Sequence, residues 1–132
     1  MRVLSHLLVL VFVIGGISSV RAEVAGIQLG IQIQQDQQML HIRPMVQVDH
    51  DQQVHYELTA KTEGGSNRAQ STQSGVFLAH NGNQFMNNTL MVRVPSVGTS
   101  WVVVLDVWGH DQMHTHVVRR VHIDALGKIV IT

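Results

Sequence analysis

The segment GHDQMHTHVVRR, residues 109–120, concentrates side chains that could bind a metal: His110, Asp111, His114 and His116. Residues two apart on a β-strand point to the same face, so His114 and His116 would lie side by side. Imidazoles at this spacing, with a further histidine from the preceding turn, can converge on Cu(II) or Zn(II). The alternative is a β-hairpin whose polar turn and solvent-facing positions carry imidazoles. A His-x-His pair does not decide between the two.

Other chemistry has less support in the sequence. The chain contains no cysteine, which excludes thiolate nucleophiles, thiolate metal sites and disulfides. We find no Gly-x-Ser-x-Gly turn around a nucleophilic serine and no glycine-rich phosphate loop between a strand and a helix. The sequence therefore predicts a protein that is not an enzyme and that has no cofactor.

The N-terminus has the pattern of a secretory signal peptide. Arg2 precedes an apolar run over residues 3–14, and the segment ends in Val20-Arg21-Ala22. The run is too short to span a membrane, which takes about 20 apolar residues. We therefore expect residues 1–22 to be cleaved on export, leaving residues 23–132 as a single domain without membrane association.

The charge balance of the mature chain is nearly neutral. Signal cleavage would remove two of the nine basic residues, leaving seven against nine acidic residues. Such a balance does not favour binding to nucleic acid or to an anionic membrane surface.

Apolar and polar residues alternate through most of the mature chain, and no helical period of useful length appears. The alternating segments are residues 27–34, 40–48, 54–61, 90–94, 101–108 and 115–123. Turn signals separate them at intervals of roughly 8–12 residues, a pattern typical of β-sandwiches. We predict an all-β, immunoglobulin-like β-sandwich of about seven antiparallel strands.

Some positions allow more specific predictions. Pro44 places its strand at a sheet edge or at a bulge, because proline cannot donate a ladder hydrogen bond. Residues 68–74 are polar and predict an exposed or edge strand, followed by a turn at Ser74-Gly75 and a return to the core at residues 76–78. Residues 101–108 are apolar on both faces and predict a central strand. For the C-terminal tail, the sequence leaves two alternatives: a short strand at residues 129–131 or a frayed end.

Arginines and aromatic residues offer two candidate contact surfaces. Arg93, Arg119 and Arg120 would form a positive patch if their strands pair, suited to steering an acidic or amide-rich partner. Scattered solubilising charges are the alternative. Val102 and Trp108 on the second face of their strand could also make contacts, or could be buried under a loop or the other sheet.

Two stretches resemble a known family. They are VHYELTAKTEGGSNRAQSTQSGVF, residues 54–77, and TSWVVVLDVWGHDQMHTH, residues 99–116. The first combines a strand, a Gly-Gly-Ser turn, a polar Gln/Ser/Thr strand and an apolar segment, and the second is a β-rich hairpin with a polar, glycine-containing turn. Together they resemble the curli assembly chaperones of the CsgC/CsgH-like group over residues 54–121.

The resemblance implies a small periplasmic sandwich that keeps an amyloid-forming fibre subunit from polymerising before secretion. Enteric members carry a Cys-x-Cys at the start of the strand that corresponds to residues 54–61. This chain has Gln52, Gln53, Val54 and His55 there, so the likeness is closer to the cysteine-free CsgH-like branch, and no redox role is expected. The implied partners are the curli subunit and, as further candidates, other components of curli secretion.

Three functional hypotheses follow. The first is a chaperone of curli-like fimbria and biofilm assembly, expected to be monomeric. Its candidate client-binding residues are Arg68, Gln70, Thr72, Arg93, Arg119 and Arg120. The second is a copper- or zinc-binding sandwich that uses His110, His114 and His116. The third is a structural subunit of a surface fibre, for which internal repeats would be expected and none is clear.

Overall fold

The computed structural model describes residues 23–24, 26–65, 68–86, 88–109 and 114–132. The predicted signal peptide, residues 1–22, lies outside the described residues. Within them, all regular structure is β: β1 (Glu23–Val24), β2 (Ile27–Asp36), β3 (Met39–Val48), β4 (Gln52–Glu63), β5 (Gln70–Ala79), β6 (Gly82–Phe85), β7 (Leu90–Arg93), β8 (Ser100–Trp108), β9 (His114–Ile123) and β10 (Ile129–Ile131). No described segment forms a helix able to cross a membrane.

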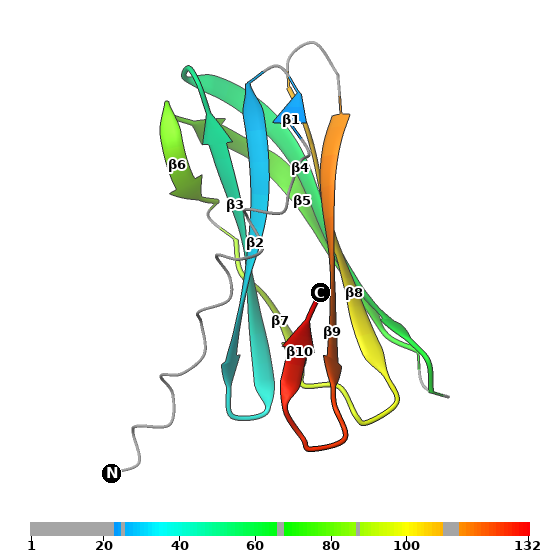
Figure 1. The fold of residues 1–132 in the computed structure, drawn as a ribbon. Helices are drawn as coiled ribbons and strands as arrows, with labels where there is room; N and C mark the ends of the chain where they lie inside the picture. Colours follow the sequence, from blue (N-terminus) through cyan, green and yellow to red (C-terminus); the bar gives the residue numbers. More distant parts are fainter. Residues whose placement is uncertain (1–22, 25, 66–67, 87, 110–113) are drawn as a thin grey trace.

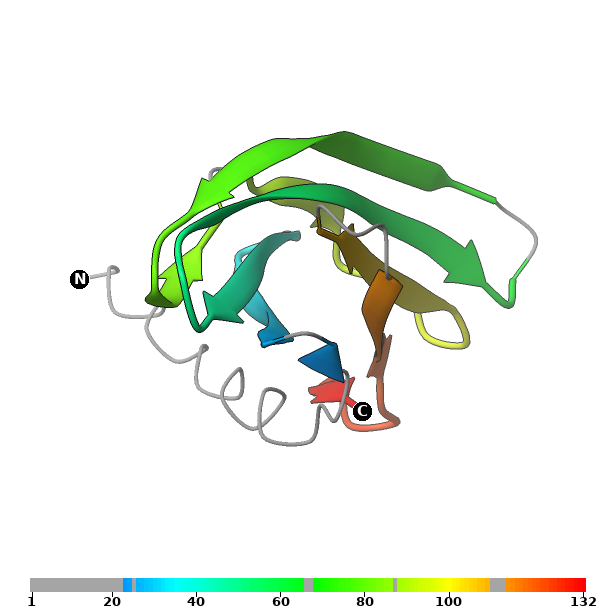
Figure 2. The same ribbon diagram turned by 90° about the horizontal axis from the view of Figure 1, so that it is seen from above.

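The strands form two antiparallel sheets that face each other (Figures 1 and 2). The first sheet has the order β1-β2-β3-β6, with β7 also paired to β3. The second sheet has the order β10-β9-β8-β4-β5. The predicted all-β sandwich is confirmed. The strand number exceeds the expected seven because β1 and β6, with two and four residues, are too short to show a period in sequence, and because the short strand left open at residues 129–131 forms as β10.

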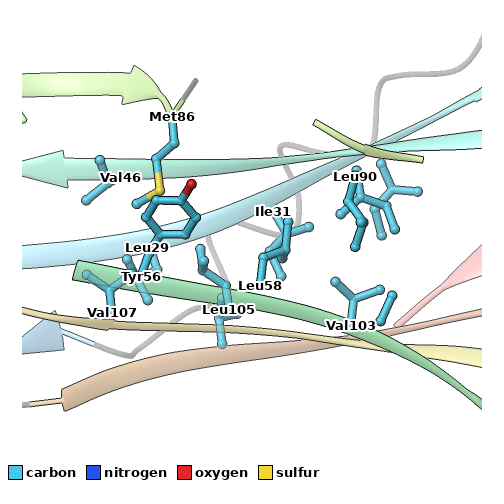
Figure 3. Packing of buried hydrophobic residues seen from close by; sticks show 14 of the residues in the cluster. Leu29, Ile31, Val46, Tyr56, Leu58, Met86, Leu90, Val103, Leu105 and Val107 are labelled. Carbon is cyan, nitrogen blue, oxygen red and sulfur yellow. The ribbon is translucent and has the colours of Figure 1, made fainter. Parts of the chain in front are cut away.

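Alternate side chains of both sheets fill the space between them (Figure 3). Leu58 of β4 and Leu105 of β8 are fully buried and lie opposite each other in the second sheet. Leu29 and Ile31 of β2 and Val46 of β3 enter the core from the first sheet. The apolar residues of the alternating segments therefore face the core, and β8 is central between β4 and β9 as predicted.

The expectation that Pro44 marks an edge strand or a bulge is wrong, because β3 is central in the first sheet and its register with β2 is unbroken. On one side of β3, β7 pairs with Met39–Ile42 and β6 pairs with Met45–Val48. Pro44 lies between the part of β3 that pairs with β7 and the part that pairs with β6. Its carbonyl accepts a hydrogen bond from the Met86 N–H at 2.9 Å. Because the N and O of a strand residue point to the same side, the missing N–H of Pro44 faces this gap and removes no bond to β2.

The predicted turn at Ser74-Gly75 is also wrong, since β5 continues unbroken through both residues. A Cβ on Gly75 would lie 3.1 Å from the hydroxyl oxygen of Tyr56, a buried residue paired with it on β4. The glycine therefore makes room for a core ring rather than for a turn. Val76 and Leu78, which were expected to return to the core, are 52% and 66% exposed, and only Phe77 packs against it.

We expect Leu58→Ala to lower the free energy of unfolding by about 3 kcal/mol, because it removes a fully buried side chain and leaves a cavity between the sheets. Urea unfolding followed by circular dichroism measures this loss. The control is Leu126→Ala in the β9–β10 turn, which is 82% exposed and should change stability by less than about 0.5 kcal/mol. Equal effects of the two substitutions would contradict the proposed core.

Candidate interaction surface

The long strand β5 forms one edge of the second sheet (Figures 1 and 2). It pairs with β4 over ten successive residue pairs, from Gln52 opposite Ala79 to Lys61 opposite Gln70. No other strand of the described chain pairs with β5. Natural sheets protect such edges with charged residues, proline or a bulge. The sequence of β5, QSTQSGVFLA, has no charge and no proline, and its register with β4 is unbroken.

The direction of the backbone groups along β5 follows from one hydrogen bond. The N–H of Thr62 donates to the carbonyl of Ala69 at 3.0 Å, immediately before β5 begins and in the same register. Bonded pairs alternate along an antiparallel ladder, so the odd-numbered residues of β5 bond to β4. The backbone groups of the even-numbered residues then point away from β4, toward the open edge. These are Gln70, Thr72, Ser74, Val76 and Leu78, and all five are exposed.

Three of the predicted client-binding residues gather at this edge. Gln70 and Thr72 lie on the polar half of β5, and Arg68 precedes the strand by two residues and is exposed. Thr72 is tied back to the sheet by a hydroxyl contact of 3.4 Å to Thr59 of β4. The edge position predicted for residues 68–74 is therefore confirmed for the part of the strand that begins at Gln70.

The other three predicted residues do not form the expected patch. Arg93 ends β7 in the first sheet, whereas Arg119 and Arg120 lie on β9 in the second, so the pairing that would join them does not occur. Arg120 is exposed, and its Nε lies 3.5 Å from a carboxylate oxygen of Glu63. Arg119 points to the opposite face, donates to the carbonyl of Val118 at 2.9 Å, and has its pKa lowered by burial. The prediction failed because neighbouring residues of a strand face opposite sides of the sheet.

The histidine segment is described only from residue 114 onward, and His110 lies outside the described residues. His114 and His116 are exposed on the same face of β9, as the spacing predicted. The Nδ1 of His114 lies 3.3 Å from both carboxylate oxygens of Asp106 on β8. The described residues contain no group of three or more histidines and acidic residues placed to hold a metal.

A row of stacked rings crosses the outer face of the second sheet. The sequence singled out Trp108 as a candidate contact residue but not the row, and Val102, the other candidate, is buried at 6% exposure. The Trp108 ring lies between those of His55 and His114, with centroid distances of 5.6 Å and 4.9 Å. The register places Val76 of β5 beside His55 on the same row. Only the register of β4, β8 and β9 brings these residues together, so spacing along the chain carried no signal for the row.

We expect the mature chain to bind Cu(II) no more tightly than millimolar, because His114 is engaged by Asp106 and Trp108 rather than directed toward further ligands. Isothermal titration with Cu(II) tests this, using a variant with both His114→Ala and His116→Ala. His41→Ala on the first sheet serves as the control. A micromolar dissociation constant that is lost in the double variant and kept in the control would establish the metal-binding alternative instead.

No protein-family model matches the chain, and no curated protein matches it. Solved structures with the same fold include two that we compare with the chain. The solution structure of R. palustris CsgH has a TM-score of 0.54 and 14% identity, covering 69% of this chain and 90% of CsgH. The E. coli curli protein CsgC has a TM-score of 0.56 and 20% identity, covering 70% of this chain and 96% of CsgC. The chain therefore has the fold of CsgC and CsgH, as the resemblance in residues 54–121 predicted.

Proposed function

We propose that this chain, after removal of residues 1–22, is a periplasmic chaperone that keeps an amyloid-forming, curli-like fibre subunit from polymerising before secretion. The observation that carries the proposal is the open, uncharged edge of β5 on a sandwich with the fold of two curli proteins. The fold alone supports no activity. The open edge of β5 supplies a physical means of inhibiting fibre polymerisation.

Amyloid growth and the β5 edge share the same chemistry. A fibre grows when strands pair with an exposed edge through backbone hydrogen bonds. A soluble sandwich with an open edge can pair with the same strand and hold it away from the fibre. Gln70, Thr72 and Ser74 have amide and hydroxyl side chains on the outer face of the sheet. This half of the edge therefore adds little apolar surface of its own. Action by the chain alone needs no cofactor and no catalytic residue.

Arg68 gives the edge a nearby positive charge. It lies two residues before β5 and is exposed, whereas Arg120 faces Glu63 and Arg93 belongs to the other sheet. An exposed charge steers encounters with a partner whose net charge has the opposite sign, over about 10 Å at ordinary salt, whether or not the bound segment itself is charged. We therefore propose Arg68, Gln70 and Thr72 as client-contacting residues and assign Arg93, Arg119 and Arg120 no common role.

The proposed function predicts a long added lag when the mature chain is mixed with purified curli major subunit at well below equimolar ratio. The lag should lengthen because few fibre edges exist early in growth and the mature chain can occupy each of them. Thioflavin-T fluorescence measures it, with and without a chelator. A lag that vanishes with the chelator would make a metal part of the mechanism, and no change at any ratio would contradict the chaperone function.

We expect Arg68→Glu to shorten this added lag severalfold at low salt, and to have less effect as salt is raised, because exposed charges act mainly on encounter rates. Arg93→Glu is the matched control, since it makes the same charge change on the other sheet. The two variants should retain the circular dichroism spectrum of the parent chain. Equal shortening by both would show that only net charge matters and would remove Arg68 from the contact surface.

A further inference from the structure

Resting on the proposed function, we propose that β5 binds one extended client segment as a sixth strand of the second sheet, and that this segment is uncharged and two-part. Amide and hydroxyl side chains would lie beside Gln70, Thr72 and Ser74. Apolar side chains would lie beside Val76 and Leu78.

The length and regularity of the edge favour a strand over a side-chain contact. Five outward residues, from Gln70 to Leu78, present ten backbone donors and acceptors on one side of an unbroken strand. A bulge would have made the edge irregular and twisted it away from an incoming strand. An incoming strand of similar length can satisfy these groups in one register.

The absence of charge on β5 selects against charged segments. The strand carries no ionisable side chain from Gln70 to Ala79, so a charged residue placed beside it finds no partner on β5. A charged side chain beside these exposed residues gains no ion pair on β5, whereas amide and hydroxyl groups can hydrogen-bond to Gln70 and Thr72. Segments rich in glutamine, asparagine, serine and threonine are therefore favoured.

Val76 and Leu78 fix the alignment of the segment. Both are largely exposed, and they are successive outward residues at one end of β5. Val76 continues into the ring row through His55 and Trp108, which gives this end an apolar and aromatic surface. Apolar side chains of the client would be buried here in contact with β5 and β4. The opposite alignment would place them against Gln70 and Thr72.

A second copy of the chain fits the edge less well than a client does. Two antiparallel β5 strands related by a two-fold axis at Ser74 would place Leu78 opposite Gln70 and Val76 opposite Thr72. Every apolar residue would then face a polar one. Shifting the register to pair the apolar residues with each other would move the contact into the turn after Ala79 and shorten the ladder.

The first test uses two capped peptides of about ten residues, long enough to match β5. One peptide has valine at one end and glutamine along the rest of the same face, with serine on the other face. The second has lysine and glutamate in place of the glutamines. Amide hydrogen exchange followed by NMR is the readout. We expect only the first peptide to slow exchange, and only at Gln70, Thr72, Ser74, Val76 and Leu78, because the intervening amides already bond to β4.

Two pairs of variants probe the edge itself. Thr72→Pro removes one outward N–H, whereas Thr72→Ala loses the same contact to Thr59 but keeps the N–H. Replacing Val76 and Leu78 with lysine charges the apolar end, and Leu126→Lys is the control for added charge on an exposed leucine. We expect Thr72→Pro and the double lysine variant each to weaken peptide binding by about tenfold, and the two controls to change it less than twofold.

The outcomes separate this inference from the proposed function. Inhibition of fibre growth without slowed exchange at the even-numbered residues would overturn the inference and leave the chaperone function standing. Equal binding of the charged peptide, or concentration-dependent protection of these amides without peptide together with a doubled mass, would overturn it also. The latter result would assign the edge to a second copy. Alternating protection by the uncharged peptide, lost in Thr72→Pro, would support the inference even if fibre growth were unaffected.

Discussion

Much of this structure depends on the register of β4, which is hydrogen-bonded to β5 on one side and to β8 on the other. The even-numbered side chains of β4, such as Leu58, enter the core, and the odd-numbered ones, such as His55, lie on the outer face. A slip of one residue would exchange these two sets, exposing the core residues and burying the polar ones. Because the core resists that slip, the same register also fixes which groups face the open edge of β5.

Function and stability therefore use opposite sides of the same strands. Burial of Val54, Tyr56 and Leu58 holds β4 in place, and β4 holds β5 through alternate residues. The remaining backbone groups of β5 are left for a partner. A small sandwich without disulfides can keep such an edge in shape because its ordering comes from the core on the inner side, and does not depend on the outward side chains.

The open edge carries a risk that the rest of the fold limits. An exposed strand can recruit other copies of the chain as readily as a client. On β5 the apolar residues gather at one end and the polar residues at the other, so self-pairing is poorly matched. The opposite edge of the second sheet, β10, is only three residues long, and short edge strands offer little to pair with.

The sequence by itself determined the fold class, because the alternation of residues such as Ile27, Leu29 and Ile31 is a local property of the chain. It also predicted the central position of β8 and the edge position of the polar part of β5. It misplaced Gly75 and Pro44, since the first serves a ring contributed by β4 and the second lies between two partner strands.

Only the tertiary structure decided which residues share a surface. The row of His55, Trp108 and His114 joins three strands, and the separation of Arg93 from Arg120 follows from their membership of different sheets. Strand pairing brings together residues distant in sequence, and nothing in the local alternation specifies which strands will be neighbours. The physical reason is that side-chain periodicity reports the faces of a strand, whereas partners and register are set by packing of the whole core.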